Sequence, residues 1–172
     1  SRHMQPNSAL LVVDVQNDFT PGGALPITEG DEVVPVLNGY IARFREADRP
    51  VFLSRDWHPE ETVHFKAQGG PWPPHCVQNT PGAAFHPDLN VPEEAIVISK
   101  GMGYDVDSYS AFLGQDAEGS PLLGRLREMG VEHLYIGGLA LDYCVRYSTK
   151  DALDQGFGAT LLIDATRAVN LK

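Results

Sequence analysis

Cysteine and basic residues are scarce in this sequence of 172 residues. Two cysteines are too few for a disulfide framework, so we expect a reducing, cytoplasmic environment. Lysine and arginine together number 13, against 23 aspartate and glutamate residues, which gives a formal net charge of −10. Because the sequence has no basic cluster to neutralise phosphates, we do not expect nucleic acid to be a partner.

Long apolar runs are also absent. No run is long enough to span a bilayer, and none has the pattern of a signal peptide, so we expect no membrane association. Hydrophobic residues make up 42% of the chain and charged residues 21%, which is ordinary for a globular protein. We expect a single domain over residues 5–172, because residues 1–4 are typical of a cloning scar.

Five short apolar runs predict a parallel β-sheet. They are residues 9–15, 50–54, 95–99, 133–136 and 160–163. The first and last are nearly continuous in Val, Leu and Ile, as expected for strands that are buried on both faces. Helical patterns alternate with the runs, which favours a three-layer, doubly wound α/β fold with helices on both faces of the sheet. No helical pattern follows the last run, so we expect a closing helix and strand to be missing from this sequence.

Three segments have the periodicity of amphipathic helices. The first has its apolar stripe at positions 33, 37, 40, 41 and 44, with Asp31 as the expected cap. The second is expected to start with Ser120 as its N-cap and to end at Gly130. The third is expected to run from Cys144, with Leu153 on its buried face.

The connection over residues 56–92 interrupts this alternation. It is long and rich in Pro, Gly and aromatic residues, and such a long connection in a compact domain is usually functional. Asp56 and His58 lie two positions apart, on one side of an extended chain, and His64 and His75 follow. Carboxylate and imidazole donors suit a divalent ion such as Zn, Fe or Mn, with open positions for water or substrate. The alternative is that the histidines are structural.

Reactive side chains stand at the ends of four of the apolar runs. Asp14 ends the first run, Asp56 and His58 follow the second, Lys100 ends the third, and Cys144 follows the fourth. Ligands of open α/β sheets bind beyond the carboxyl ends of the strands. We therefore expect these side chains to meet at one edge of the sheet.

Cys144, Asp14 and Lys100 can supply a nucleophile, a proton acceptor and a cation. At the first turn of a helix, the macrodipole would lower the pKa of the Cys144 thiol and favour the thiolate, and Lys100 would act in the same direction. Each residue also has a simpler interpretation. The thiol could be a small packing group, the carboxylate could cap the following loop, and the lysine could point into solvent.

Aromatic residues lie in the loops beside the expected metal ligands. Phe19 follows the first strand, and Trp72 lies three residues before His75. They predict a pocket that holds a flat aromatic substrate, although each could instead belong to the core. The second cysteine, Cys76, is expected to be structural, and a redox pair with Cys144 is the alternative.

Several short motifs follow one another along nearly the whole chain, from Leu10 to about Asn170. The most specific are LVVDVQNDF (11–19), SRDWHP (54–59), WPPHCVQ (72–78) and GGLALDYCV (137–145). They are accompanied by segments 22–25, 80–83, 100–101 and 107–112. Together they resemble the nicotinamidase/pyrazinamidase branch of the isochorismatase-like cysteine hydrolases.

This resemblance implies two sets of functional residues. The catalytic set is Asp14, Lys100 and Cys144, and the metal set is Asp56, His58 and His75, with His64 at a fourth position that varies between family members. The resemblance also implies a cis peptide between Leu139 and Ala140, which would turn the Ala140 amide toward the Cys144 amide and form an oxyanion hole. Leu139 and Tyr143, beside the nucleophile, are expected to bind substrate together with Phe19 and Trp72.

The implied activity is the deamidation of nicotinamide, and also of pyrazinamide, through a thioester on Cys144 in NAD salvage. The implied cofactor is one divalent metal ion, Zn before Fe or Mn, and the implied partner is a small aromatic amide. The alternative within the superfamily is an N-carbamoyl or ureido amide substrate, and ether hydrolysis as in isochorismatase is a further one. A non-enzymatic metal-storing or interaction module with the same fold also stays open, as does a homo-oligomer.

Overall fold

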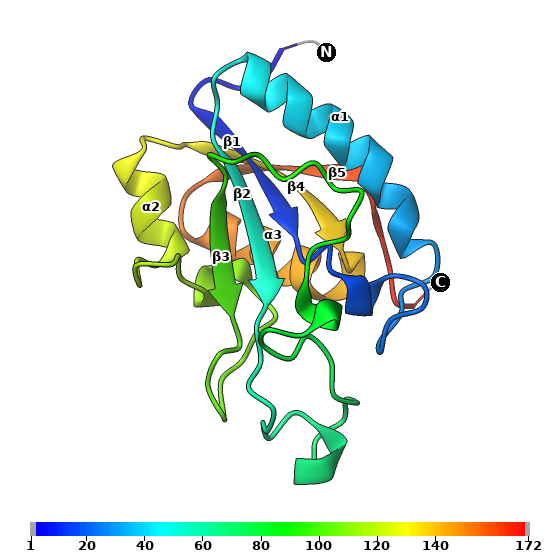
Figure 1. The fold of residues 1–172 in the computed structure, drawn as a ribbon. Helices are drawn as coiled ribbons and strands as arrows, with labels where there is room; N and C mark the ends of the chain where they lie inside the picture. The colour runs from blue at the N-terminus through cyan, green and yellow to red at the C-terminus, as the bar shows by residue number, and fades with distance from the viewer. Residues whose placement is uncertain (1–2, 171–172) are drawn as a thin grey trace.

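Within residues 3–170, which the computed structural model describes, five strands form one sheet (Figure 1). They are β1 (Ser8–Val13), β2 (Val51–Asp56), β3 (Ile96–Lys100), β4 (His133–Leu139) and β5 (Gly158–Arg167). Their order is β3-β2-β1-β4-β5, and every neighbouring pair is parallel. All five apolar runs therefore form strands, which confirms the predicted parallel sheet. The start of the expected cloning scar (1–2) and the end of the expected domain (171–172) lie outside the described residues.

Alternate residues of β1 are buried in two separate hydrophobic clusters. Leu10 and Val12 pack in the cluster that contains the apolar face of α1 (Val33–Glu46). Leu11 and Val13 pack in the other cluster, with residues of α2 (Leu122–Glu128) and α3 (Arg146–Asp154). Because successive side chains of a strand point to opposite faces, helices cover both faces of the sheet, as predicted.

Two of the expected helix caps are wrong. Glu32, not Asp31, is the N-cap residue of α1, because a 3₁₀ turn over Gly30–Glu32 leads directly into the helix. At α2 the N-cap position belongs to Pro121, and the Ser120 side chain caps nothing there. Neither N-cap residue makes a side-chain capping bond, so packing of the apolar faces holds these helices in place.

The third helix begins with a π-helical turn over Leu141–Val145, which contains Cys144, and α3 follows it. The residues of this helix that are buried include Val145, Ser148 and Ala152. Leu153 was expected on that face but is 57% exposed, so this part of the prediction is wrong. The buried face of the helix is formed by Val145, Ser148 and Ala152, and Leu153 lies one position past it.

The connection between β2 and β3, residues 57–95, is fully described and contains only the short 3₁₀ turns Lys66–Gln68 and Pro81–Ala83. In Figure 1 it extends beyond the carboxyl end of β2. Its position beyond the strand ends places its side chains over the edge of the sheet where the reactive residues are expected. No helix among the described residues has the length and apolar character needed to cross a membrane.

Candidate active site

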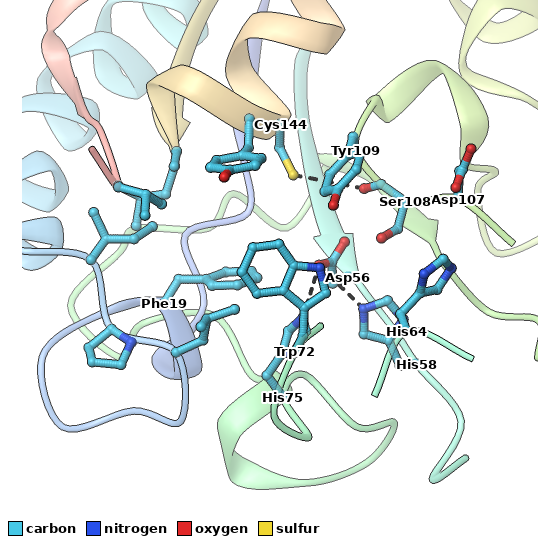
Figure 2. Close-up of a pocket in the computed structure, with 17 residues that line it drawn as sticks. Phe19, Asp56, His58, His64, Trp72, His75, Asp107, Ser108, Tyr109 and Cys144 are labelled. Atoms are coloured by element: carbon cyan, nitrogen blue, oxygen red, sulfur yellow. Dashed lines mark hydrogen bonds and ion pairs between the residues drawn. The ribbon is translucent and has the colours of Figure 1, made fainter. Parts of the chain in front are cut away.

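A pocket lies beyond the carboxyl ends of the strands and receives side chains from both the sheet and the long connection (Figure 2). Among its lining residues are most of those expected from the sequence: Phe19, Asp56, His58, His64, Trp72, His75, Leu139, Ala140, Tyr143 and Cys144. Asp14 and Lys100 are buried beneath it. The fold thus brings together residues that are up to 130 positions apart in the sequence.

Lys100 connects the expected catalytic residues to the expected metal ligands. Its Nζ donates to Asp14 Oδ2 at 2.7 Å and also to Asp56 Oδ1 and the Ser108 carbonyl. The same atom lies 3.5 Å from the Sγ of Cys144. Since the ammonium is completely enclosed, the interpretation of Lys100 as a solvated strand-end lysine is wrong.

Asp14 is also fully buried, and its backbone turns out of the β1 direction with a φ of 51°. Its Oδ1 accepts a hydrogen bond from the Ser54 hydroxyl at 2.8 Å, and its Oδ2 accepts from Lys100. Both oxygens therefore serve the site, and neither caps the following loop. Burial raises the pKa of Asp14 although Lys100 acts to lower it, so this carboxylate is a stronger base than an ordinary aspartate.

The expectation of a low thiol pKa at Cys144 is wrong. Burial raises the pKa of the Cys144 thiol well above its ordinary value. Lys100 acts in the opposite direction, but Asp14 and Asp56 both add to the increase. One ammonium faces two carboxylates here, so ionising the thiol would add a further negative charge to a buried, already negative cluster. The raised pKa favours the protonated thiol, so Cys144 would need a base in order to act as a nucleophile.

The turn that carries Cys144 has the backbone geometry implied by the resemblance. The peptide bond between Leu139 and Ala140 is cis, and both residues line the pocket. Gly138, immediately before, has a φ of 118°, and a Cβ atom there would collide with the carbonyl of Val13. Only glycine allows β4 to pass so close to β1 just before the turn that carries Cys144.

Asp56, His58 and His75 form a cluster in which the candidate ligand atoms all lie within 4.8 Å of one another. Asp56 Oδ2 is 3.4 Å from the Nε2 of His58 and 3.9 Å from the Nε2 of His75. The Nδ1 atoms of the two rings face the carbonyls of Gly101 and Pro73 at 2.9 and 2.8 Å. These carbonyls hold a proton on Nδ1 of each ring, so Nε2 is the ring atom that faces Asp56 and that a metal would use.

The electrostatics of the cluster also suit a cation. Burial acts to raise the pKa of Asp56, but Lys100 and His58 outweigh it and hold the pKa well below its usual range. Burial lowers the pKa of His75, which favours the neutral ring, whereas at His58 the neighbouring Asp56 outweighs burial and raises the pKa, so that a metal would take the place of the proton between these two side chains. An ionised carboxylate and a neutral imidazole are the states in which these groups bind metal. The donor set therefore fits a divalent ion.

His64 lines the same pocket but lies outside this three-residue cluster. Its Nε2 is 3.0 Å from the carbonyl of Val106, in the loop after β3. Figure 2 shows its ring beside His58 rather than between the three ligands. Its role as a fourth ligand stays a prediction.

Aromatic rings form the walls of the pocket. Phe19 packs against the ring of His75, with ring centroids 5.6 Å apart. Trp72 meets Tyr143 edge to face at 5.9 Å, and Tyr109 lies 5.8 Å from Tyr143. The result is a mostly apolar space, bounded by flat side chains, between the thiol and the metal cluster.

Cys76 and Cys144 are both free thiols. Cys76 is fully buried in the cluster of hydrophobic residues that includes α1, as expected for a structural cysteine. The redox pair considered as an alternative is not formed.

Other residues that position the site were not anticipated from the sequence. The Ser108 carbonyl accepts from Lys100 and lies 3.8 Å from the Cys144 sulfur. The Asp18 carboxylate accepts from the amide of Cys76 at 2.8 Å, next to the candidate ligand His75. The side chains of Gln16 and Asp142 bond the backbones of Asp56 and of Val169 and Asn170. The sequence indicates a role for these four residues only through their place in the segments that resemble the family.

Comparison with known proteins gives a consistent result. The isochorismatase domain family matches residues 8–172. The nicotinamidase/pyrazinamidase of Mycobacterium tuberculosis is 39% identical over 94% of this chain and 87% of its own. The pyrazinamidase of Pyrococcus horikoshii, solved in complex with zinc, is 48% identical with a TM-score of 0.90, covering 96% of this chain and 89% of its own. PnC1 from L. infantum, solved in complex with nicotinate, is 37% identical with a TM-score of 0.86, and the match covers 96% of this chain and 83% of PnC1.

Proposed function

The chain belongs to the isochorismatase family, and from this premise we propose that it is a metal-dependent cysteine amidohydrolase that converts nicotinamide to nicotinate and ammonia. The observation that carries the proposal is the position of Lys100. Its ammonium contacts the base Asp14, the nucleophile Cys144 and the metal ligand Asp56 within one enclosed site. The relatives named as nicotinamidases and pyrazinamidases support the choice of substrate, and pyrazinamide is the expected second substrate.

The first half of the reaction forms a thioester. Asp14 takes the proton from the Cys144 thiol as the sulfur attacks the carboxamide carbon. The raised pKa of Asp14 supports this role, since a stronger conjugate base removes a proton from a weakly acidic thiol more readily. The backbone amides of Ala140 and Cys144 hold the oxyanion, and Asp14 then gives its proton to the departing ammonia.

The second half restores the enzyme. A water molecule attacks the thioester carbonyl while Asp14 accepts one of its protons, and Asp14 then returns this proton to the departing sulfur of Cys144, which restores the thiol. The acid product loses its remaining proton to solvent and leaves as nicotinate. The Lys100 ammonium stays charged throughout, because burial is outweighed by Asp14 and Asp56 and its pKa is raised well above the ordinary value. It thereby limits the negative charge that accumulates in the site.

Substrate and metal occupy the two sides of the pocket. The pyridine ring lies between Phe19, Trp72, Leu139 and Tyr143, all of which line the pocket. Asp56, His58 and His75 would hold one divalent ion, Zn before Fe or Mn, with His64 as a fourth ligand. Such an ion would supply Lewis acidity for binding the ring nitrogen of the substrate. The free thiols support a reducing, cytoplasmic setting.

Ammonia release from nicotinamide tests the proposal. Purified protein should release ammonia when it is loaded with Zn²⁺, lose this activity after treatment with a chelator, and recover it when Zn²⁺ is returned. Pyrazinamide and an N-carbamoyl amino acid are assayed in parallel. Turnover of the N-carbamoyl compound without turnover of nicotinamide would assign the chain to the alternative substrate class, and metal-replete protein inactive on every amide would refute the proposal.

A further inference from the structure

The side chain of Gln16 is completely buried and makes three hydrogen bonds. Its Nε2 donates to the carbonyl of Asp56 at 2.8 Å and to the carbonyl of Ala83 at 2.9 Å. Its Oε1 accepts from the backbone amide of Asp56 at 2.9 Å. One carboxamide thus bonds both main-chain polar groups of an expected metal ligand, which lies 40 positions away in the sequence.

The place of Gln16 follows from where β1 ends. The last backbone bond that reaches β2 from β1 joins the Asp14 amide to the Ser54 carbonyl at 3.0 Å, and at Asp14 the chain turns away with a φ of 51°. Asp56 lies two residues further along β2, beyond the reach of the β1 backbone. There the carboxamide of Gln16, with one donor and one acceptor, takes the place of the missing peptide group.

On its other side Asp56 is in register with Lys100 of β3, and the next amide, that of Trp57, donates to the Lys100 carbonyl at 2.9 Å. The Asp56 backbone is therefore fixed from both sides, although it stands at the end of its strand. Its carboxylate oxygens consequently have defined partners, with Oδ1 toward Lys100 and Oδ2 toward the imidazoles of His58 and His75.

We infer that Gln16 is a positioning residue for the metal site, which fixes the main chain of Asp56 so that its carboxylate faces the two histidines and Lys100 at once. The inference rests on the metal-dependent function proposed above. Gln16 itself touches neither substrate nor metal. It holds the Asp56 backbone in place beyond the point where β1 ends and can no longer bond β2. Outer hydrogen-bonding partners orient metal ligands in the same way.

Gln16→Met is the test variant, because methionine has a similar length and neither donates nor accepts a strong hydrogen bond. Asn17→Leu is the matched control. The neighbouring Asn17 amide bonds the carbonyl of Pro81 at 2.8 Å, in the same 3₁₀ turn that Gln16 reaches, but does not bond Asp56. The two variants each remove a side-chain amide from the same loop, and only the first loses the contact with the metal ligand.

The measurement is the Co²⁺ affinity of the metal-free proteins, by competition with a chelating dye, together with the visible absorption of bound Co²⁺. We expect Gln16→Met to bind Co²⁺ about 10- to 100-fold more weakly than the wild type, with a changed absorption spectrum. Asn17→Leu should match the wild type in both. Thermal unfolding of the metal-free proteins shows how much stability each variant loses.

Wild-type affinity and spectrum in Gln16→Met would overturn the inference, whatever its stability. Equal weakening in both variants would overturn it too, since the loss would then come from the loop in general. If Gln16→Met does not fold, Gln16→Glu is judged by the same criteria, as it keeps the length and loses the donor to the Asp56 carbonyl. Wild-type protein that binds Co²⁺ but releases no ammonia from any amide would refute the proposed function alone and leave the role of Gln16 in place.

Discussion

The ammonium nitrogen of Lys100 lies 2.7 Å from Asp14 Oδ2, and both side chains are completely closed off from solvent. The same ammonium also serves Asp56, so that one buried positive charge balances two buried negative ones. Removing one partner of a buried ion pair leaves an uncompensated charge, which costs far more than the pair contributes. The proposed catalytic base Asp14 and the proposed metal ligand Asp56 therefore depend on the same lysine for their ionisation states.

Replacing Lys100 with Met should lower the free energy of unfolding and abolish ammonia release. Asp14 and Asp56 would be left buried without a cation, at a cost of about 3–5 kcal/mol in the free energy of unfolding. Urea denaturation measures the loss. Lys150→Met is the control, because Lys150 pairs with Asp154 on the surface at 2.8 Å and its removal should change little. Unchanged stability in Lys100→Met would contradict the buried-charge argument, and partial recovery in the double variant with Asp14→Asn would strengthen it.

Cys144→Ala should release no ammonia and should still bind one metal ion per chain. The sulfur is the proposed attacking atom, whereas the ligand cluster of Asp56, His58 and His75 does not include it. Elemental analysis and the ammonia assay on the same preparation check both halves of this prediction. Residual ammonia release well above background would show that another group attacks the amide.

The pKa of Cys144 gives a prediction about alkylation. Burial disfavours the charged thiolate and raises the pKa, so the thiolate fraction is small at neutral pH and grows as the pH rises. In metal-free protein we expect iodoacetamide to label Cys144 slowly at pH 7, with a rate that is still increasing above pH 9. Mass spectrometry of the labelled peptide measures the rate, with glutathione as the reference thiol. A rate that levels off below pH 7 would mean a preformed thiolate and would contradict the raised pKa.

The sequence was sufficient to predict which residues meet. Asp14, Lys100 and Cys144 stand at or just after strand ends, and the carboxyl ends of parallel strands share one edge. The close spacing of Asp56 and His58 likewise kept both on one side of the chain. These predictions needed only strand positions, which the apolar runs indicate directly.

The remaining features depend on distances through space. The pKa of Cys144 is set by its burial and by charges from three other strands, so the local rule that a helix start lowers a thiol pKa failed. The role of Gln16 depends on where β1 stops relative to β2, to within two residues, and strand ends are the least predictable part of an element. The exposure of Leu153 follows from the position of the buried stripe after a π-helical turn, which the apolar pattern does not encode.

Asp142 lies two residues before the proposed nucleophile Cys144. Its carboxylate accepts from the amides of Val169 and Asn170, both at 2.9 Å, and from the Asn170 side chain at 3.0 Å. These bonds lower the pKa of Asp142 although partial burial acts to raise it. They hold the segment after β5 against the nucleophile turn, and Val169 in that segment lines the pocket.

Asp142→Ala should therefore weaken substrate binding by releasing Val169 from the pocket wall. The loss of about 1 kcal/mol of net hydrogen bonding corresponds to a KM for nicotinamide raised roughly fivefold. Metal content should stay at the wild-type level, because Asp142 does not belong to the ligand cluster. Asp164→Ala is the control, since Asp164 is also a carboxylate at this end of the chain but bonds the exposed hydroxyl of Tyr40. An unchanged KM in Asp142→Ala, or an equal rise in both variants, would show that the bonds to Val169 do not shape the pocket.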